Sequence, residues 1–266
     1  MRENRLRAVL ASGETAVSAW LSTSSPYLAE VLSHCGYDAV TVDLQHGMFG
    51  LGQAVSLLQA VSAGPAMPMA RCPSHDPATI GKLLDAGAYA IICPAVDTAA
   101  QAAAFVSACR YPPAGTRSFG PSRGLLYGGR DYAEHADSTI LTWAMIESAQ
   151  ALENLPAILA TPGLDGVFVG PNDLALSLGE LPGQPQAPAA VSAALGRVAA
   201  ATRAAGRWAG VFCADAQTAR QMADLGYQFV TAGTDVGVMR QAAAERIATV
   251  RRAGPRPEGP HDRSGY

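Results

Sequence analysis

Short apolar runs recur along the chain and alternate with longer, alanine-rich stretches. The runs are apolar at consecutive positions rather than at every second position, which is typical of parallel strands buried on both faces. This pattern predicts strands at residues 16–22, 39–45, 67–72, 90–96, 141–147, 166–171, 209–213 and 229–235. Most of the runs end at a glycine, a proline or a charged residue, which marks the junction with the next element.

The stretches between these runs predict helices at residues 26–37, 76–88, 98–110, 148–160 and 216–227. In the second of them, Asp76 stands where an N-cap acceptor is expected and Pro77 where the first helical residue is expected. Repeated strand–helix units over about 250 residues match a single-domain (β/α)8 TIM barrel. A doubly wound open sheet is the alternative, but no Gly-x-Gly-x-x-Gly motif follows the first strand.

Two segments interrupt the alternation. Residues 111–138 form a long connection rich in glycine, proline and arginine, and loops of this length in a compact domain usually serve function. Residues 255–266 are polar and are expected to form a disordered tail. No linker divides the rest, so residues 1–254 are expected to form one domain.

Composition excludes several classes of protein. The 266 residues carry 19 basic and 22 acidic side chains, so there is no basic excess for binding a nucleic-acid backbone. No apolar run has the roughly 18 residues of a membrane helix, and the N-terminus lacks the apolar segment of a secretory signal. The five cysteines are scattered without CxxC spacing, which is typical of buried thiols in a reducing compartment. A cytoplasmic globular protein is therefore expected.

Polar residues gather where the predicted strands end. TIM-barrel enzymes place their chemistry at the carboxyl ends of the strands, so these residues are the candidates for function. They are Asp43, Gln45 and His46 after the second strand, Arg71 at the third, Glu147 at the fifth, and Asn172 and Asp173 after the sixth.

Glu147 and Asp173 are the most informative pair. If the fifth and sixth strands are neighbours, their ends lie roughly 4.8 Å apart, and two carboxylates there repel one another unless a cation lies between them. A divalent ion held by two protein carboxylates keeps about four positions for water and substrate, as catalytic sites require. The alternative is an N-cap role for Asp173 and a surface salt bridge for Glu147.

His46 and Arg71 supply the other parts of an enolate-forming site. A carboxylate that holds one imidazole nitrogen raises the basicity of the other, and Asp43 and Asp85 are the carboxylates available for His46. Arg71 offers a permanent charge where negative charge develops on oxygen. For a lone histidine or arginine at a strand end, a structural role is the alternative.

Several long sequence blocks resemble the HpcH/HpaI family of class II pyruvate aldolases. They are VTVDLQHG, ARCPSHDPATIGKLLDAGAYAIICPAVDTAAQA, CRYPPAGTRSFGPSRG, IESAQALENL, PGLDGVFVGPNDLALSLG and LGYQFVTAGTDVGVM, and the resemblance runs from about residue 14 to 250. It implies a barrel of the phosphoenolpyruvate/pyruvate type. It further implies His46 as the catalytic base, Arg71 as transition-state stabiliser, Asp85 as the aspartate that raises the basicity of the histidine, and Glu147 and Asp173 as ligands of a divalent ion (magnesium, manganese, cobalt or zinc).

The resemblance also implies that a 2-oxo acid binds through the metal and near Gly170 and Asn172, with Asp173 beside it. It implies assembly as well, since members of the family form hexamers, pairs of trimers, with active sites near subunit contacts. A homo-oligomer, a trimer or hexamer, is therefore expected. Two positions depart from the family pattern: Met145 stands where a glutamine is common in the pyruvate-side pocket, and Gln45 stands where several members have glutamate. Substrate preference is therefore not inherited from the family.

The function expected from the sequence is metal-dependent, reversible cleavage of a 4-hydroxy-2-oxo acid to pyruvate, or a related 2-oxo acid, and an aldehyde through a metal-stabilised enolate. The alternatives are an acyl-CoA lyase of the malyl or citryl type and a barrel that binds 2-oxo acids without catalysis. Met145 is the feature that favours the last of these.

Overall fold

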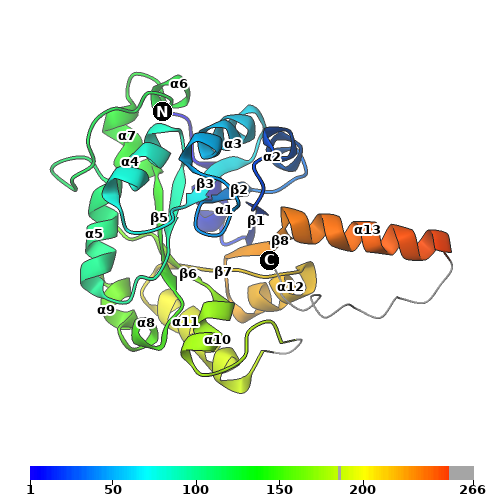
Figure 1. The fold of residues 1–266 in the computed structure, drawn as a ribbon. Coiled ribbons are helices and arrows are strands. Elements are labelled where there is room, and N and C mark those ends of the chain that lie inside the picture. The colour runs from blue at the N-terminus through cyan, green and yellow to red at the C-terminus, as the bar shows by residue number, and fades with distance from the viewer. Residues whose placement is uncertain (185–186, 252–266) are drawn as a thin grey trace.

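Eight parallel strands close into a barrel in the computed structural model, which describes residues 1–184 and 187–251 (Figure 1). Each strand pairs with the next along the chain, and the last pairs with the first. The strands are β1 (Ala16–Leu21), β2 (Ala39–Asp43), β3 (Met67–Arg71), β4 (Ala90–Cys93), β5 (Leu141–Ile146), β6 (Gly166–Val169), β7 (Trp208–Val211) and β8 (Phe229–Thr234). The predicted TIM barrel is confirmed, and with it the position of every predicted strand.

Helices surround the barrel and connect its strands. They are α1 (Arg5–Ser12), α2 (Pro26–Ser33), α3 (Leu51–Ala63), α4 (Pro77–Asp85), α5 (Ala99–Cys109), α6 (Gly124–Gly128), α7 (Tyr132–Thr139), α8 (Ala149–Glu153), α9 (Leu155–Leu159), α10 (Pro171–Ser177), α11 (Ala189–Ala204), α12 (Ala216–Leu225) and α13 (Asp235–Arg251). The predicted cap of α4 is confirmed, because the Asp76 carboxylate accepts hydrogen bonds from the amides of Ala78 and Thr79.

Two predictions about the connections were incomplete. The helix expected at 148–160 is divided into α8 and α9, because Pro156 has no N–H to donate to the carbonyl of Leu152. The Arg197 guanidinium occupies that carbonyl instead, at 2.8 Å. The connection at 111–138 contains α6 and α7. The expected tail at 255–266 lies outside the described residues.

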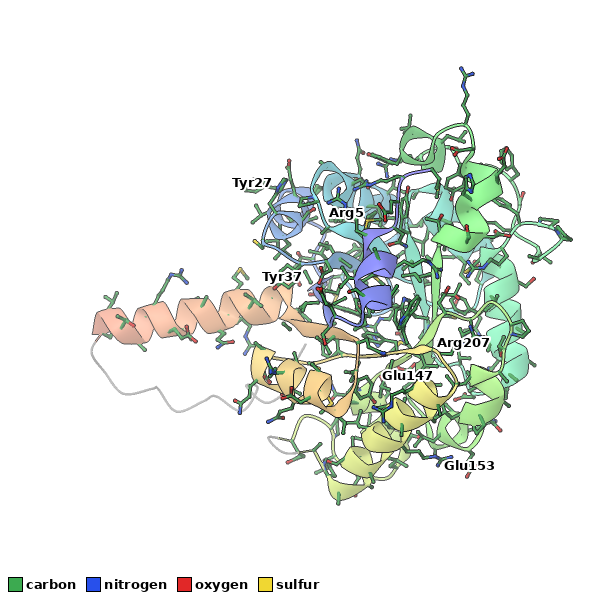
Figure 2. The ribbon with its side chains drawn as sticks, turned by 180° about the vertical axis from the view of Figure 1, so that it is seen from behind. Arg5, Tyr27, Tyr37, Glu147, Glu153 and Arg207 are labelled. Atoms are coloured by element: carbon green, nitrogen blue, oxygen red, sulfur yellow. The ribbon has the colours of Figure 1, made fainter. Side chains whose placement is uncertain are left out.

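The interior of the barrel is filled by large apolar side chains, so it is a packed core. Trp20, Met69, Trp143 and Phe168 belong to this cluster, and Leu6 and Leu10 of α1 join it from the end where the strands begin. Figure 2 shows α1, which carries Arg5, lying across the barrel. At the barrel axis, α1 therefore covers the amino ends of the strands and leaves their carboxyl ends uncovered.

The last helix leaves the body of the molecule. Figure 1 shows α13 projecting away from the barrel, and several of its apolar side chains are exposed, namely Val238, Met239, Ile247 and Val250. In the parts of the chain that the structure describes, no helix has the length and apolar character that crossing a bilayer demands.

Candidate active site

Asp43 and Arg71 form a buried ion pair at the carboxyl ends of β2 and β3. The parallel register places the two residues directly opposite each other. The Arg71 Nε donates to Asp43 Oδ1 at 2.8 Å and its Nη2 donates to Oδ2 at 2.6 Å, while the guanidinium lies over the Trp20 ring, 4.9 Å from its centroid. A bidentate pair stacked on an aromatic ring holds the arginine in one orientation.

The same carboxylate orders the turn that carries His46. Burial alone would raise the pKa of Asp43, but the hydrogen bonds and charge of Arg71 outweigh burial and hold this pKa below its ordinary value. Its Oδ1 also accepts from the backbone amides of Gln45 and His46, at 3.1 and 3.3 Å. Asp43 therefore stays an anion that binds Arg71 and the backbone of the turn, and the His46 side chain extends from this turn in an exposed position.

We expect Asp43→Asn to lower the free energy of unfolding by about 3–5 kcal/mol near neutral pH, since it leaves the buried Arg71 charge without its anion. The pKa of Asp43 is lower in the folded than in the unfolded chain. Its stabilisation is therefore complete above the unfolded value of about 3.9 and is lost as the pH falls through the folded value. Urea unfolding should show that the difference in the free energy of unfolding between wild type and Asp43→Asn becomes smaller in acid.

Asp224→Asn is the matched control for this prediction, because it breaks an exposed pair with Arg220. Exposed pairs of this kind contribute about 0.5 kcal/mol or less, so the control should remain close to wild type. The buried ion pair would be contradicted if both variants lost the same free energy of unfolding. It would also be contradicted if the difference between Asp43→Asn and wild type did not depend on pH.

Glu147 follows β5 and holds a buried carboxylate with one oxygen unsatisfied. Its Oε1 accepts the amide of Ala95 at 2.7 Å, whereas Oε2 is buried without a hydrogen-bond partner. Burial raises the pKa of Glu147, the Ala95 amide opposes this rise, and the charge of Asp173 adds to it. Asp173, half-buried in the first turn of α10, is thus close enough for the two carboxylates to repel.

Gly170 provides the space beside this carboxylate. A Cβ at position 170 would lie 2.6 Å from Glu147 Oε2 and 3.0 Å from Met145 Cε. The pairing of Ile146 with Val169 explains this proximity, because it places Glu147 and Gly170 side by side just beyond the two strands. Any larger residue here would displace the glutamate, so the glycine is required by its neighbours.

The structure brings most of the predicted site residues into one cavity. It is lined by Arg71, Met145, Gly170, Asn172 and Asp173, together with Pro171 and Phe212. Met145 is buried, and its sulfur lies 4.0 Å from the Arg71 Nη1. Met145 faces the cavity because alternate residues of β5, such as Trp143 and Met145, point into the barrel.

Asp85 is not brought to this cavity. It is the last residue of α4, and a helix of this fold ends where the following strand begins, at the opposite end of the barrel. Its carboxylate pairs there with the buried Arg117 at 2.8 Å. The sequence offered Asp85 as a carboxylate for His46, and the resemblance implied the same role, but the structure does not place Asp85 at the carboxyl ends of the strands of its own barrel. The role of this residue remains a prediction.

The residues present fit a divalent ion. An unsatisfied buried carboxylate oxygen is costly unless a cation or donor meets it, and Asp173 adds a second hard oxygen donor next to Glu147. Within residues 1–184 and 187–251, no group of three His, Cys, Asp or Glu side chains is arranged as a metal site. Two carboxylates leave about four positions of an octahedron for water and substrate, as an open catalytic site requires.

Three contributors to this site were not predicted from the sequence. Trp20 supports Arg71 and donates its indole N–H to Asp43 Oδ2 at 3.1 Å, and Phe212 lines the cavity. Both occupy inward-facing positions. Because successive side chains of a strand point in opposite directions, their positions along β1 and just beyond β7 could have indicated them. Nothing in the sequence indicates the third, the amide of Ala95, whose residue has a φ of 51°.

Most of the chain matches one family of known proteins. The family model described as HpcH/HpaI aldolase/citrate lyase matches residues 17–242. The hydroxypyruvate/pyruvate aldolase of Rhizorhabdus wittichii is 42% identical over 248 residues, which cover 93% of this chain and 99% of the relative. The 4-hydroxy-2-oxo-heptane-1,7-dioate aldolase of Shigella sonnei is 36% identical, over 91% of this chain and 92% of the relative.

Solved structures show the same fold. A HpcH/HpaI aldolase/citrate lyase family protein from Burkholderia cenocepacia J2315 superposes with a TM-score of 0.88 at 35% identity, over 93% of this chain and 99% of that chain. The citrate lyase β subunit of M. tuberculosis, solved with oxaloacetate and magnesium, has a TM-score of 0.56 at 16% identity, over 86% of this chain and 93% of that chain. This more distant likeness concerns the fold alone.

Proposed function

Because the chain belongs to the HpcH/HpaI aldolase/citrate lyase family, and is thus a carbon–carbon lyase, we propose that it is a divalent-metal-dependent class II aldolase. It reversibly cleaves a 4-hydroxy-2-oxo acid to an aldehyde and pyruvate or a related 2-oxo acid. The carrying observation is the unsatisfied Oε2 of Glu147, buried beside Gly170 and near the charge of Asp173, two residues that line the cavity together with Arg71.

Glu147 and Asp173 would hold the ion, and Glu147 is already oriented by the Ala95 amide. When bound, a divalent ion supplies the positive charge that stabilises an enolate of the 2-oxo acid. Arg71 uses Nε and Nη2 to bind Asp43, which leaves Nη1, next to the Met145 sulfur, as its donor toward the cavity. This donor is fixed before substrate arrives, so it stabilises developing charge without reorganisation.

His46 acts as the base. In the cleavage direction it takes the proton from the C4 hydroxyl, directly or through a water molecule, as the C3–C4 bond breaks. In the synthetic direction it returns this proton to the new hydroxyl. Asp43 keeps the backbone of the His46 turn in place through its two amide hydrogen bonds.

The proposed assembly is a homo-oligomer, a trimer or hexamer, in the cytoplasm. Two features of the chain support subunit contacts: the exposed apolar side chains of the projecting helix α13, and the position of Asp85 at the far end of its own barrel. Asp85 would then raise the basicity of His46 in a neighbouring subunit rather than in its own chain.

Mixing inactive subunits tests this arrangement. We expect His46→Ala and Asp85→Ala proteins, each impaired alone, to regain roughly a quarter of wild-type activity after co-refolding, since a quarter of the sites then combine two intact residues. A mixture of His46→Ala and Arg71→Ala is the control and should gain nothing, because these two residues serve one site from the same chain. No recovery in the first mixture would place the function of Asp85 elsewhere.

Met145 is expected to set the preference for the 2-oxo acid. Methionine offers a polarisable apolar surface, whereas glutamine would hydrogen-bond the bound 2-oxo acid. Met145→Gln should therefore shift the activity ratio toward pyruvate over substituted 2-oxo acids such as hydroxypyruvate, by about three- to tenfold, the value of one net hydrogen bond. Met145→Leu, which adds no donor, is the control. An unchanged ratio across several 2-oxo acids would mean that this side chain does not contact the substrate.

The proposed activity is tested with purified protein, pyruvate or hydroxypyruvate, a panel of aldehydes and each of magnesium, manganese, cobalt and zinc. Aldol products that require added metal and disappear with chelator support the aldolase. A protein that binds pyruvate but neither forms products nor exchanges the methyl protons of pyruvate with solvent would be a binding barrel, and the proposal would fail.

A further inference from the structure

Asp235, the first residue of α13, binds the segment that follows β1. Its Oδ1 accepts from the Ser22 amide at 3.0 Å and the Ser22 hydroxyl at 2.5 Å, and its Oδ2 accepts from the Thr23 amide and hydroxyl at 3.1 and 2.6 Å. The residue is only 6% exposed. Hydrogen bonds to a buried carboxylate are short and strong, so one side chain fixes two consecutive residues more than 200 positions away in sequence.

Ser22 continues this connection to the turn that carries His46. Its carbonyl accepts the amide of Met48 at 3.0 Å, two residues beyond the histidine. On the other side of the histidine, the Asp43 carboxylate accepts the His46 amide, and the Asp43 carbonyl accepts the amide of Gly47 at 3.1 Å. The turn is thus held before His46 by Asp43 and after it by Ser22.

Gly47 allows a close approach of backbone and side-chain atoms within this turn. A Cβ at this position would lie 2.1 Å from the Asp43 carbonyl oxygen and 2.7 Å from the Phe49 ring. The backbone of the His46 turn is attached to the rest of the barrel at these two points. One attachment is the Asp43 site already described, and the other leads through Ser22 to Asp235.

We propose that Asp235 is a positioning residue for His46, acting through Ser22 and Met48. This inference rests on the proposed role of His46 as the base. The connection follows the order of the strands, since β8 pairs with β1 and β1 pairs with β2. Asp235 begins α13 directly after β8, Ser22 follows β1, and the His46 turn follows β2.

Asp235→Asn tests the proposal. The substituted amide group keeps one acceptor but turns a donor toward either Ser22 or Thr23, each of which presents a backbone N–H. We expect kcat to fall about 10- to 100-fold, because small displacements of a catalytic group have effects of this size. The KM for the 2-oxo acid and the affinity for Mn²⁺, measured directly by calorimetry, should not change, since neither depends on His46.

A double-mutant cycle separates positioning from general stability. In the His46→Ala background, Asp235→Asn should cause no further loss of kcat, because the group that it positions is gone. Equal losses in both backgrounds would overturn the proposal. Asp215→Asn is the matched control: Asp215 accepts the amide and hydroxyl of Thr218 at the start of α12, away from the His46 turn, and its substitution should leave kcat unchanged.

Hydrogen exchange tests the connection without any activity. The Met48 amide should exchange faster in Asp235→Asn than in wild type or Asp215→Asn, and an unchanged rate would overturn the proposal whatever His46 does. If His46→Ala proves fully active while the exchange result holds, the assignment of the base fails and the connection stands. Should Asp235→Asn not fold, Ser22→Ala removes one of the four hydrogen bonds and should show smaller changes in the same direction.

Discussion

Glu147→Ala should abolish metal-dependent activity and leave the fold intact. The substitution removes one of the two carboxylates proposed to hold the ion, so the remaining Asp173 cannot retain it at ordinary concentrations. The free energy of unfolding should fall much less than the activity. The wild-type side chain buries an oxygen without a hydrogen-bond partner, and such a group is costly to the folded state. The measurement is the aldol reaction across a titration of Mn²⁺ or Mg²⁺, with thermal unfolding recorded in parallel.

Glu153→Ala is the matched control for this experiment. Glu153 lies at the end of α8, six residues further along the chain, and is exposed. Figure 2 shows Glu147 among the strands and Glu153 at the periphery of the molecule. The control should keep wild-type activity and the same dependence on metal. A defect in Glu147→Ala that high metal concentration rescues would agree with the assignment, whereas full activity after chelator treatment would refute it.

His46→Ala should lower the rate of aldol cleavage by roughly 10²- to 10⁴-fold, the usual contribution of a positioned general base. Binding of pyruvate should survive, because it depends on Arg71 and the two carboxylates rather than on the imidazole. The measurements are kcat across the pH range and the dissociation constant of pyruvate in the presence of Mn²⁺. Separating the two quantities distinguishes a lost base from a damaged pocket.

The control for His46→Ala is His135→Ala, which changes a half-exposed histidine on α7 paired with Asp131. It should leave both kcat and pyruvate binding at wild-type values. If His46→Ala instead kept the pH–rate profile of the wild type, the proton would be taken by another group, and a hydroxide ion in the site would be the first candidate.

The sequence indicated the strands because their residues are buried on both faces and are apolar without interruption. Glu147 and Arg71 are candidates for the same reason, since polar residues at the ends of such strands stand out from their surroundings. The interruption between α8 and α9 was not predicted, although Pro156 was present as a signal. Helical composition in α8 and α9 continues through the proline, whereas the hydrogen-bond ladder does not.

The sequence by itself determined the barrel, the end of the barrel that carries polar groups, and the types of chemistry those groups offer. Only the tertiary structure decided which groups meet. Asp43 binds Arg71 because the register of β2 and β3 aligns them, and Ala95 reaches Glu147 through a backbone amide that carries no sequence signal. Asp235 and Ser22 lie 213 residues apart and meet because the barrel closes between its last and first strands. Local patterning reports burial and periodicity along the chain, whereas these contacts depend on strand register and closure, which form only when distant segments pack together.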